Sequence, residues 1–263
     1  MKFVHLLARL TGTFWYITED ALDNITHLLE SRLAGVALQT PLFKAEAAGS
    51  AAGSPGTAVI PIRGVIGKGL SSLEMACGGA DINAIEKAFN QANADPAVQR
   101  IVLAIDSPGG TVTGVPELAR HIWDTKSKPV QARSDSLIGS AAYYLAAAAD
   151  EIVVTPTTAV GSIGVVAQVR ETLDSTSADG RTRLRVFRSG ADKLMGSDGP
   201  LSDTQAAHMQ ERADFLGDMF RAFVTETRPG VTAESMTGLT YFGEDAVKRG
   251  LATRVVSSLS ELG

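Results

Sequence analysis

Residues 100–110 read Arg100-Ile-Val-Leu-Ala-Ile105 followed directly by Asp106-Ser-Pro-Gly-Gly110. The first part is a continuous apolar run, typical of a strand that is buried on both faces of a parallel sheet. The second part is a turn in which two glycines let the backbone approach a ligand closely. Because α/β proteins place their sites in loops at the carboxyl ends of parallel strands, we expect this turn to belong to a functional site.

The sequence on both sides of this stretch alternates between short apolar runs and segments with helical periodicity. We expect strands at 58–62, 129–132, 152–154, 165–169, 184–187 and 255–256, and helices at 81–95, 113–123, 139–149, 202–227 and 243–249. Asp81, Thr113 and Ser202 are the expected N-caps. The alternation predicts an α/β fold with a largely parallel sheet, and the Ala-rich helix at 139–149 is expected to be buried.

The N-terminal part of the chain differs in composition from the rest. Apolar residues recur on one face of an expected helix at 18–34, for which Thr18 can serve as N-cap. Residues 45–57 are mostly Ala, Gly, Ser and Pro, which is typical of a flexible linker. We therefore expect a small N-terminal helical segment at 1–44, a linker at 45–57 and the main domain at 58–263.

Composition excludes several classes of protein. The net charge is −5, whereas nucleic-acid-binding proteins usually have a basic excess. Cys77 is the only cysteine, which excludes an intramolecular disulfide and a thiolate-rich metal site. No apolar run reaches the roughly 18 residues of a transmembrane helix, and His5 and Arg9 interrupt the N-terminal apolar stretch, so we expect no membrane anchor and no signal peptide. No group of side chains has metal-ligand spacing, and we expect neither a metal nor a cofactor.

A second motif, Ile138-Gly139-Ser140-Ala141-Ala142, leads into the Ala-rich helix. A serine in this place is usually an N-cap. It can also be a nucleophile, because the N–H groups of the first helical turn lie beside its oxygen and can stabilise an oxyanion. The flanking spacing differs from the elbow that carries the serine of α/β-hydrolases.

A third motif, Ser189-Gly-Ala-Asp-Lys193, contains a lysine. A lysine is most often a solvated surface charge. A buried lysine loses its proton more easily, because desolvation disfavours the charged form, and it can then act as general base to a serine.

Taken together, the motifs resemble the signal peptide peptidase A family of serine proteases. The resemblance rests on DSPGG at 106–110, GSAAYYLAAAADEIVVTPTTAVGSIGV at 139–165 and SGADKLMGSDGPLS at 189–202, and the tail at 239–251 also matches the family's ending. The resemblance implies a Clp protease/crotonase-like fold with repeated β-β-α units, here preceded by the N-terminal helical segment. It also implies a serine endopeptidase that needs no cofactor and forms homo-oligomers.

The resemblance assigns roles to individual residues. Ser140 is the implied nucleophile and Lys193 the implied general base, which together form a Ser–Lys dyad. The backbone N–H groups of Gly110 and Ala141 are the implied oxyanion hole. Ser107, Pro108 and Gly109 complete the supporting loop. The family commonly has Gly-Gly where this chain has Ala141-Ala142.

The segment WYITEDALDNITHLLESR at 15–32 resembles the leader of the phage branch of this family. That branch implies a capsid assembly protease that processes capsid, portal or scaffold proteins, located in the host cytoplasm or the procapsid. Some members carry a C-terminal scaffold, which we expect to be absent or removed here. The resemblance also implies small apolar side chains near the cut bond. A cytoplasmic peptidase that degrades signal peptides is the alternative within the family.

Three other hypotheses are compatible with the same sequence. A Ser-His-Asp triad would need His121 or His208 as its base. A crotonase-like acyl-CoA enzyme would need a carboxylate base, for which Asp106 and Glu117 are available. A structural role without catalysis is the third alternative.

Overall fold

The structure, a computed structural model, describes residues 14–25, 55–71, 74–75, 78–167 and 200–262. Most of the expected linker, the expected strand at 184–187, Cys77 and Lys193 lie outside these residues.

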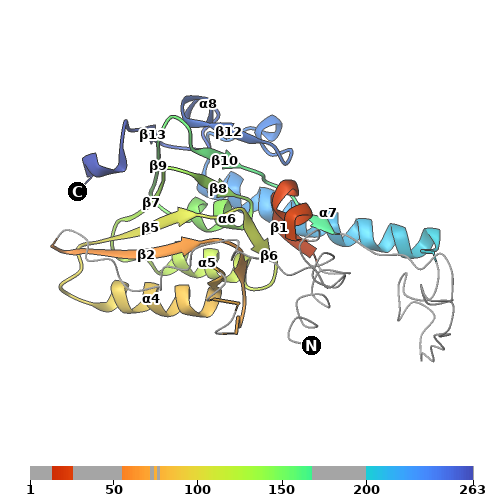
Figure 1. Ribbon diagram of the computed structural model, residues 1–263, viewed down its shortest axis with the longest axis horizontal. Helices are drawn as coiled ribbons and strands as arrows, with labels where there is room; N and C mark the ends of the chain where they lie inside the picture. Colours follow the sequence, from red (N-terminus) through yellow and green to blue (C-terminus); the bar gives the residue numbers. More distant parts are fainter. Residues whose placement is uncertain (1–13, 26–54, 72–73, 76–77, 168–199, 263) are drawn as a thin grey trace, which may run out of the picture.

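A parallel sheet forms the centre of the molecule (Figure 1). Its strands, in spatial order, are β13 (Arg254–Val255), β9 (Glu151–Val154), β7 (Val130–Ser134), β5 (Arg100–Asp106) and β2 (Thr57–Arg63). Every neighbouring pair is parallel. The apolar run in β5 lies in the interior of this sheet, as its composition predicted.

Shorter strands form two further sheets beside the first. One has the order β12 (Thr240–Phe242), β10 (Ala159–Gly161), β8 (Leu137–Gly139), and the other β11 (Val166–Ala167), β1 (Phe14–Ile17), β6 (Gly109–Thr111), β3 (Ile66–Gly67), β4 (Ala80–Asp81). A long strand, a short strand and a helix follow one another in β5-β6-α5 and again in β7-β8-α6. The expected α/β class with repeated β-β-α units is thereby confirmed.

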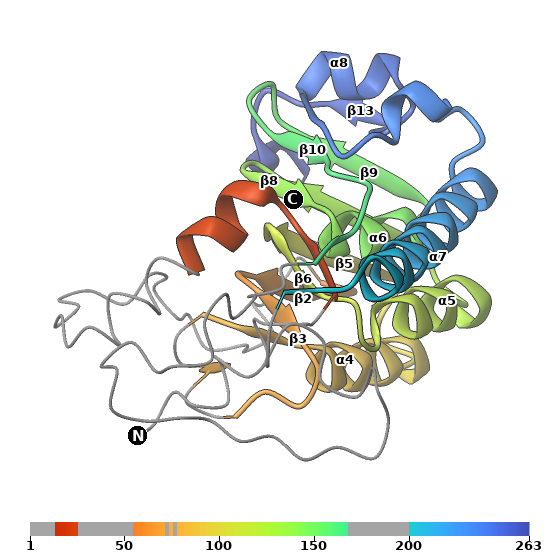
Figure 2. The same ribbon diagram turned by 90° about the vertical axis from the view of Figure 1, so that its right-hand side faces the viewer.

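Four helices lie on one side of these sheets, as Figure 2 shows: α4 (Ile82–Ala94), α5 (Val115–Thr125), α6 (Ala141–Ala147) and α7 (Asp203–Thr227). Helix α8 (Gly243–Lys248) lies beside β10 and β13, and short 3-10 turns occur at Ala233–Ser235 and Leu259–Leu262. Two expected N-caps are confirmed. Asp81 accepts a hydrogen bond from the Ala84 amide, and Ser202 forms a reciprocal capping box with Gln205.

The expected N-cap at Thr113 is wrong. Helix α5 begins at Val115, and its N-cap is Gly114, which has a φ of 87°. The loop therefore continues one residue further than expected. A left-handed conformation that glycine adopts without steric cost closes it.

Helix α6 is buried along its whole length, as the sequence predicted. Small alanine side chains allow it to pack between the sheets and α7 (Figure 2). The buried guanidinium of Arg228 donates hydrogen bonds to the carbonyls of Ala146 and Ala149 at its carboxyl end. A cation at this end satisfies free carbonyls and complements the helix dipole.

The N-terminal segment contains a strand that the sequence analysis did not anticipate. Residues Phe14–Ile17 form β1, which lies antiparallel between β6 and β11, and a helix follows over residues 19–25. The expected N-terminal helical segment therefore also contains a strand, and the helix expected at 18–34 begins at residue 19. Four consecutive aromatic or β-branched residues favour a strand, and all four are buried.

Candidate active site

The structure brings two of the sequence motifs together at the carboxyl ends of β5 and β7. The Ser107 amide donates to the Leu137 carbonyl over 3.0 Å, and the Gly139 amide donates to the Ser107 carbonyl over 2.9 Å. These bonds hold the glycine turn beside the residues that precede Ser140. The site thus lies where an α/β sheet is expected to carry one.

The turn itself is held by the side chain of Ser107, which is buried. Its hydroxyl donates to the Gly64 carbonyl over 2.6 Å and accepts from the Gly109 amide over 3.1 Å. Two hydrogen bonds to the backbone thus link this serine to Gly64 and to the glycine turn.

Both glycines of the turn occupy places that a side chain cannot share. A Cβ on Gly110 would lie 1.9 Å from the Ile66 carbonyl oxygen. Gly109 has a φ of 104°, and a Cβ on it would lie 3.0 Å from the Ala141 nitrogen. The turn therefore packs directly against the first turn of α6, so the residues implied as an oxyanion hole are neighbours.

Ser140 has an unusual backbone conformation, with φ of 51° and ψ of −111°. Its amide donates to the Gly161 carbonyl over 2.8 Å, and its carbonyl accepts from the Tyr144 amide over 2.9 Å. These bonds hold the residue in a sparsely populated region of φ/ψ space. Strain of this kind in non-glycine residues is concentrated at functional sites.

The Ser140 hydroxyl is buried and has no hydrogen-bond partner among the described residues. In particular, it makes no capping bond to α6, although the residue stands at the N-cap position. The interpretation of Ser140 as a simple N-cap is therefore not supported. A buried hydroxyl without a partner costs free energy, which calls for an explanation beyond stability.

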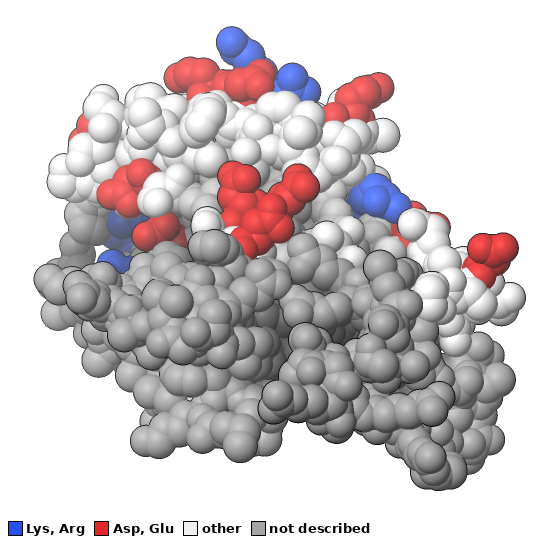
Figure 3. All heavy atoms as spheres, turned by 45° about the vertical axis from the view of Figure 1, so that its right-hand side comes forward, with Lys and Arg blue, Asp and Glu red and all other residues white. Residues whose placement is uncertain are grey.

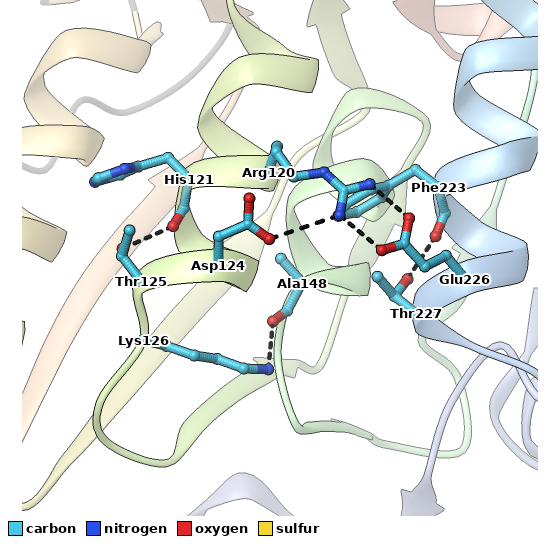
Figure 4. A network of polar contacts seen from close by, with 9 residues as sticks. All are labelled: Arg120, His121, Asp124, Thr125, Lys126, Ala148, Phe223, Glu226 and Thr227. Atoms are coloured by element: carbon cyan, nitrogen blue, oxygen red, sulfur yellow. Dashed lines mark hydrogen bonds and ion pairs between the residues drawn. The ribbon is translucent and has the colours of Figure 1, made fainter.

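The candidate histidine bases lie elsewhere. The ring of His121 contacts the Asn90 side chain on α4 over 2.7 Å, and in Figure 4 it points away from the α7 side of α5. His208 lies on α7 with 54% of its side chain exposed, 3.7 Å from Glu211. Neither histidine bonds the Ser140 hydroxyl, so the described residues offer no Ser-His pair.

The carboxylates considered for the acyl-CoA alternative, Asp106 and Glu117, are both exposed. No group of His, Cys, Asp and Glu that could hold a metal ion occurs among the described residues. Within the same part of the chain, no helix has both the length and the apolarity to cross a bilayer. Lys193 lies outside the described residues.

An aromatic group borders the site, which the sequence analysis missed. The ring of Tyr144 stacks on Phe220 with centroids 4.4 Å apart, and Tyr16 contacts both rings at 5.6 and 5.1 Å. Burial raises the pKa of Tyr144 to about 12, so the phenol is neutral at physiological pH. The aromatic run that begins at Phe14 was the available signal, because such runs are typical of buried strands.

Comparison with known proteins places the chain among proteases. The profile described as "Peptidase family S49" matches residues 123–260. Capsid assembly protease C of Escherichia phage lambda is 30% identical over 208 residues, which are 77% of this chain and 47% of that protein. Head-tail preconnector protein GP5 of Enterobacteria phage P21 is 29% identical over 208 residues, which are 77% of this chain and 41% of that protein. The chain thus spans less than half the length of these two relatives.

Solved structures that superpose on the chain include a mutant ClpP1 from Listeria monocytogenes and an enoyl-CoA hydratase from Mycobacterium avium. The ClpP1 match has a TM-score of 0.46 and 12% identity, and covers 78% of this chain and 94% of that one. The hydratase match has a TM-score of 0.45 and 17% identity, and covers 82% of this chain and 71% of that one.

Proposed function

Because the chain belongs to peptidase family S49, a family of serine proteases, we propose that it is a serine endopeptidase with Ser140 as nucleophile and Lys193 as general base. The observation that carries the proposal is the Ser140 hydroxyl. It is buried and unpartnered among the described residues, and it belongs to a residue held in a strained conformation next to the glycine turn. A hydroxyl on a strained residue at a helix N-terminus, with no hydrogen bond to break among the described residues, is suited to nucleophilic attack.

The chemistry follows from these positions. The Ser140 oxygen attacks the carbonyl carbon of the peptide bond while Lys193, in its neutral form, takes the hydroxyl proton. The amides of Gly110 and Ala141 stabilise the negative charge on the carbonyl oxygen. The C–N bond then breaks as Lys193 gives the proton to the leaving amine. Water hydrolyses the resulting ester by the same route.

The proposed substrates are capsid, portal or scaffold proteins during phage head assembly. The support comes from the two phage relatives, one of which is named for capsid assembly. The proposed location is therefore the host cytoplasm or the procapsid, and the proposed assembly is a homo-oligomer. Substrate binds in extended form by pairing its backbone with strand edges at the site.

Fluorophosphonate labelling across pH 6–10, with peptide mapping, tests the dyad. We expect label on Ser140 that rises with pH, as the lysine loses its proton, and that is lost in both Ser140→Ala and Lys193→Ala. Lys87→Ala, which removes an exposed lysine on α4, is the matched control and should label like the wild type. Label on another residue, or full labelling of Ser140 in Lys193→Ala, would contradict the assignment.

A further inference from the structure

Strand β1 lies between β6, which belongs to the glycine turn beside Ser140, and β11. It pairs antiparallel with β6 on one side, where Tyr16 is opposite Gly110, and with β11 on the other, where Trp15 is opposite Val166. Without β1, the facing edges of β6 and β11 would lack a strand partner among the described residues. An extended peptide that adds to exposed strand edges would make the same pairings.

The register places the Tyr16 carbonyl at the proposed oxyanion hole. The Val112 amide donates to the Phe14 carbonyl over 3.4 Å, and the Thr18 amide donates to the Pro108 carbonyl over 2.9 Å. Hydrogen-bonded pairs recur at every second residue of an antiparallel ladder, so the Tyr16–Gly110 pair between them is also of the bonded type. The Gly110 amide therefore faces the Tyr16 carbonyl.

A second measure of position agrees with this register. The point where a Cβ on Gly109 would lie is 2.1 Å from the Tyr16 carbonyl oxygen and 3.0 Å from the Ala141 nitrogen. The Tyr16 carbonyl oxygen and the Ala141 nitrogen thus lie around the same point beside Gly109. Directly after β1, the Thr18 side chain lies against Gly139, the residue before the nucleophile.

The Tyr16 side chain occupies a closed pocket beside the nucleophile. It is fully buried against Tyr144 and Phe220, and its hydroxyl donates to the Leu216 carbonyl over 2.8 Å. Tyr144 lies one turn after Ser140 on α6. The pocket therefore accepts a large aromatic side chain attached to the residue whose carbonyl is at the oxyanion hole.

The opposite face of β1 packs mainly on the segment that follows it. Trp15, Ile17 and Leu22 form a small apolar cluster separate from the main core, with Ala21, Ile25, Val65 and Val166 around it. Strand β1 and the helix at 19–25 thus form one unit that can leave the groove together.

We propose that β1 is bound in the substrate groove as a peptide substrate would be, with Tyr16 as the residue that precedes the bond facing Ser140. The inference rests on the proposed function. The chain therefore shields its own nucleophile, and other substrates reach Ser140 after β1 has left. Substrates with a large aromatic residue before the cut bond are preferred, in contrast to the small apolar residues implied by the family resemblance.

The test compares the full chain with Tyr16→Ala, which empties the pocket. We expect fluorophosphonate to label Ser140 at least about tenfold faster in the variant, because β1 loses its largest buried contact with the groove. Phe215→Ala is the matched control, since that aromatic side chain on α7 is 65% exposed. It should label at the wild-type rate. Circular dichroism and thermal unfolding check that Tyr16→Ala remains folded.

A peptide experiment keeps the inference testable if Tyr16→Ala loses stability. A synthetic peptide with the sequence of residues 13–20 should slow the labelling of Ser140 when added to the full chain, and the same peptide with alanine in place of the tyrosine should not. In fluorogenic peptides, tyrosine before the cut bond should give at least about tenfold higher kcat/KM than alanine there.

The failure of this inference and the failure of the proposed function give different results. Equal labelling of the wild type and a folded Tyr16→Ala, with no effect of the peptide, overturns self-shielding and leaves the protease assignment in place. Preference for the alanine peptide overturns the pocket assignment. A folded Tyr16→Ala that never acquires label on Ser140 overturns the proposed function itself. A Ser140-dependent cut between Tyr16 and Ile17 in the wild type supports the register.

Discussion

At the scale of single residues, the site depends on positions where the surrounding backbone restricts both the residue type and its conformation. Gly110 packs against the Ile66 carbonyl, Ser107 bonds both Gly64 and Gly109, and Ser140 is held at positive φ. The sequence indicated that these residues matter, because serine and glycine stood in suggestive patterns. The conformation of Ser140 could not be predicted, because it depends on a hydrogen bond to the Gly161 carbonyl, which is distant in the sequence. The lack of a partner for its hydroxyl among the described residues likewise depends on the tertiary structure.

Gly110→Ala should remove activity and lower stability. A methyl group 1.9 Å from the Ile66 oxygen forces the turn to move, at a cost of about 1–3 kcal/mol. The measurements are urea unfolding and labelling of Ser140. Gly164→Ala is the matched control, because among the described residues its Cβ would meet only the Gly238 backbone, at 3.8 Å. An unchanged unfolding midpoint in Gly110→Ala would contradict the described packing.

Ser107→Ala should lower the free energy of unfolding by about 1–3 kcal/mol, because the Gly64 carbonyl and the Gly109 amide both lose a buried partner. The rate of Ser140 labelling should fall as well, since the turn positions the Gly110 amide. Ser136→Ala serves as control, because no hydrogen bond of its hydroxyl is part of the site. A Ser107→Ala chain with wild-type stability would show that the turn is held by other contacts.

At the scale of elements, α7 fixes the helices that carry the site. Arg120 on α5 makes a bidentate ion pair with Glu226 on α7, with N–O distances of 2.7 and 2.5 Å, and its guanidinium lies over the Phe223 ring (Figure 4). Arg228, just after α7, bonds the carboxyl end of α6. The long helix therefore ties α5 and α6 to each other behind the nucleophile.

Glu226→Gln should reduce stability at neutral pH and have a smaller effect at low pH. Its hydrogen bond with Arg120 lowers the pKa of Glu226 below the ordinary 4.5, so the folded chain releases this proton more readily than the unfolded chain. The stabilisation is therefore present above about pH 4.5 and is lost as the pH falls through the lower folded pKa. Unfolding of both chains from pH 3 to 7 measures it, with Glu86→Gln on α4 as control. A difference that does not change with pH would contradict a role for the charge.

Some features of the helices and strands could be predicted from the sequence, and others could not. Asp81 and Ser202 were predicted as N-caps because capping depends on local hydrogen bonds, and α6 was predicted as buried because its apolar residues surround the whole helix. The predicted N-cap at Thr113 was wrong because Gly114 closes the loop and caps α5 instead. Strand β1 was missed because its pairing depends on β6 and β11, which are far away in the sequence.

At the scale of the whole molecule, the active site is closed by the first part of the chain. In Figure 1 the red N-terminal strand and helix lie beside β6, away from α4. The described face in Figure 3 carries Asp and Glu side chains in several groups and fewer Lys and Arg, in keeping with the net charge of −5. The helix at 19–25 contributes three exposed carboxylates, those of Glu19, Asp20 and Asp23.

Hydrogen exchange followed by mass spectrometry should distinguish the local opening of β1 and the helix at 19–25 from the global unfolding of the core. We expect the amides of β1 to exchange faster than those of β5, because β1 opens with the N-terminal unit while β5 opens with global unfolding. Fluorophosphonate bound to Ser140 should accelerate exchange in β1 further, since the adduct takes its place. Equal protection of β1 and β5 would show that the strand is a permanent part of the fold.

The covalent link between β1 and the rest of the chain affects when cleavage of other substrates can begin. A segment attached to its own groove acts as a competitor at an effective concentration of about millimolar, however dilute the protein is. A free substrate of equal intrinsic affinity would therefore lose the competition in dilute solution. If the same substrate were enclosed with the enzyme at a comparable, millimolar concentration, it would occupy a large fraction of the substrate grooves. Crowding of substrate around the enzyme, with no separate activator, would then determine when cutting begins.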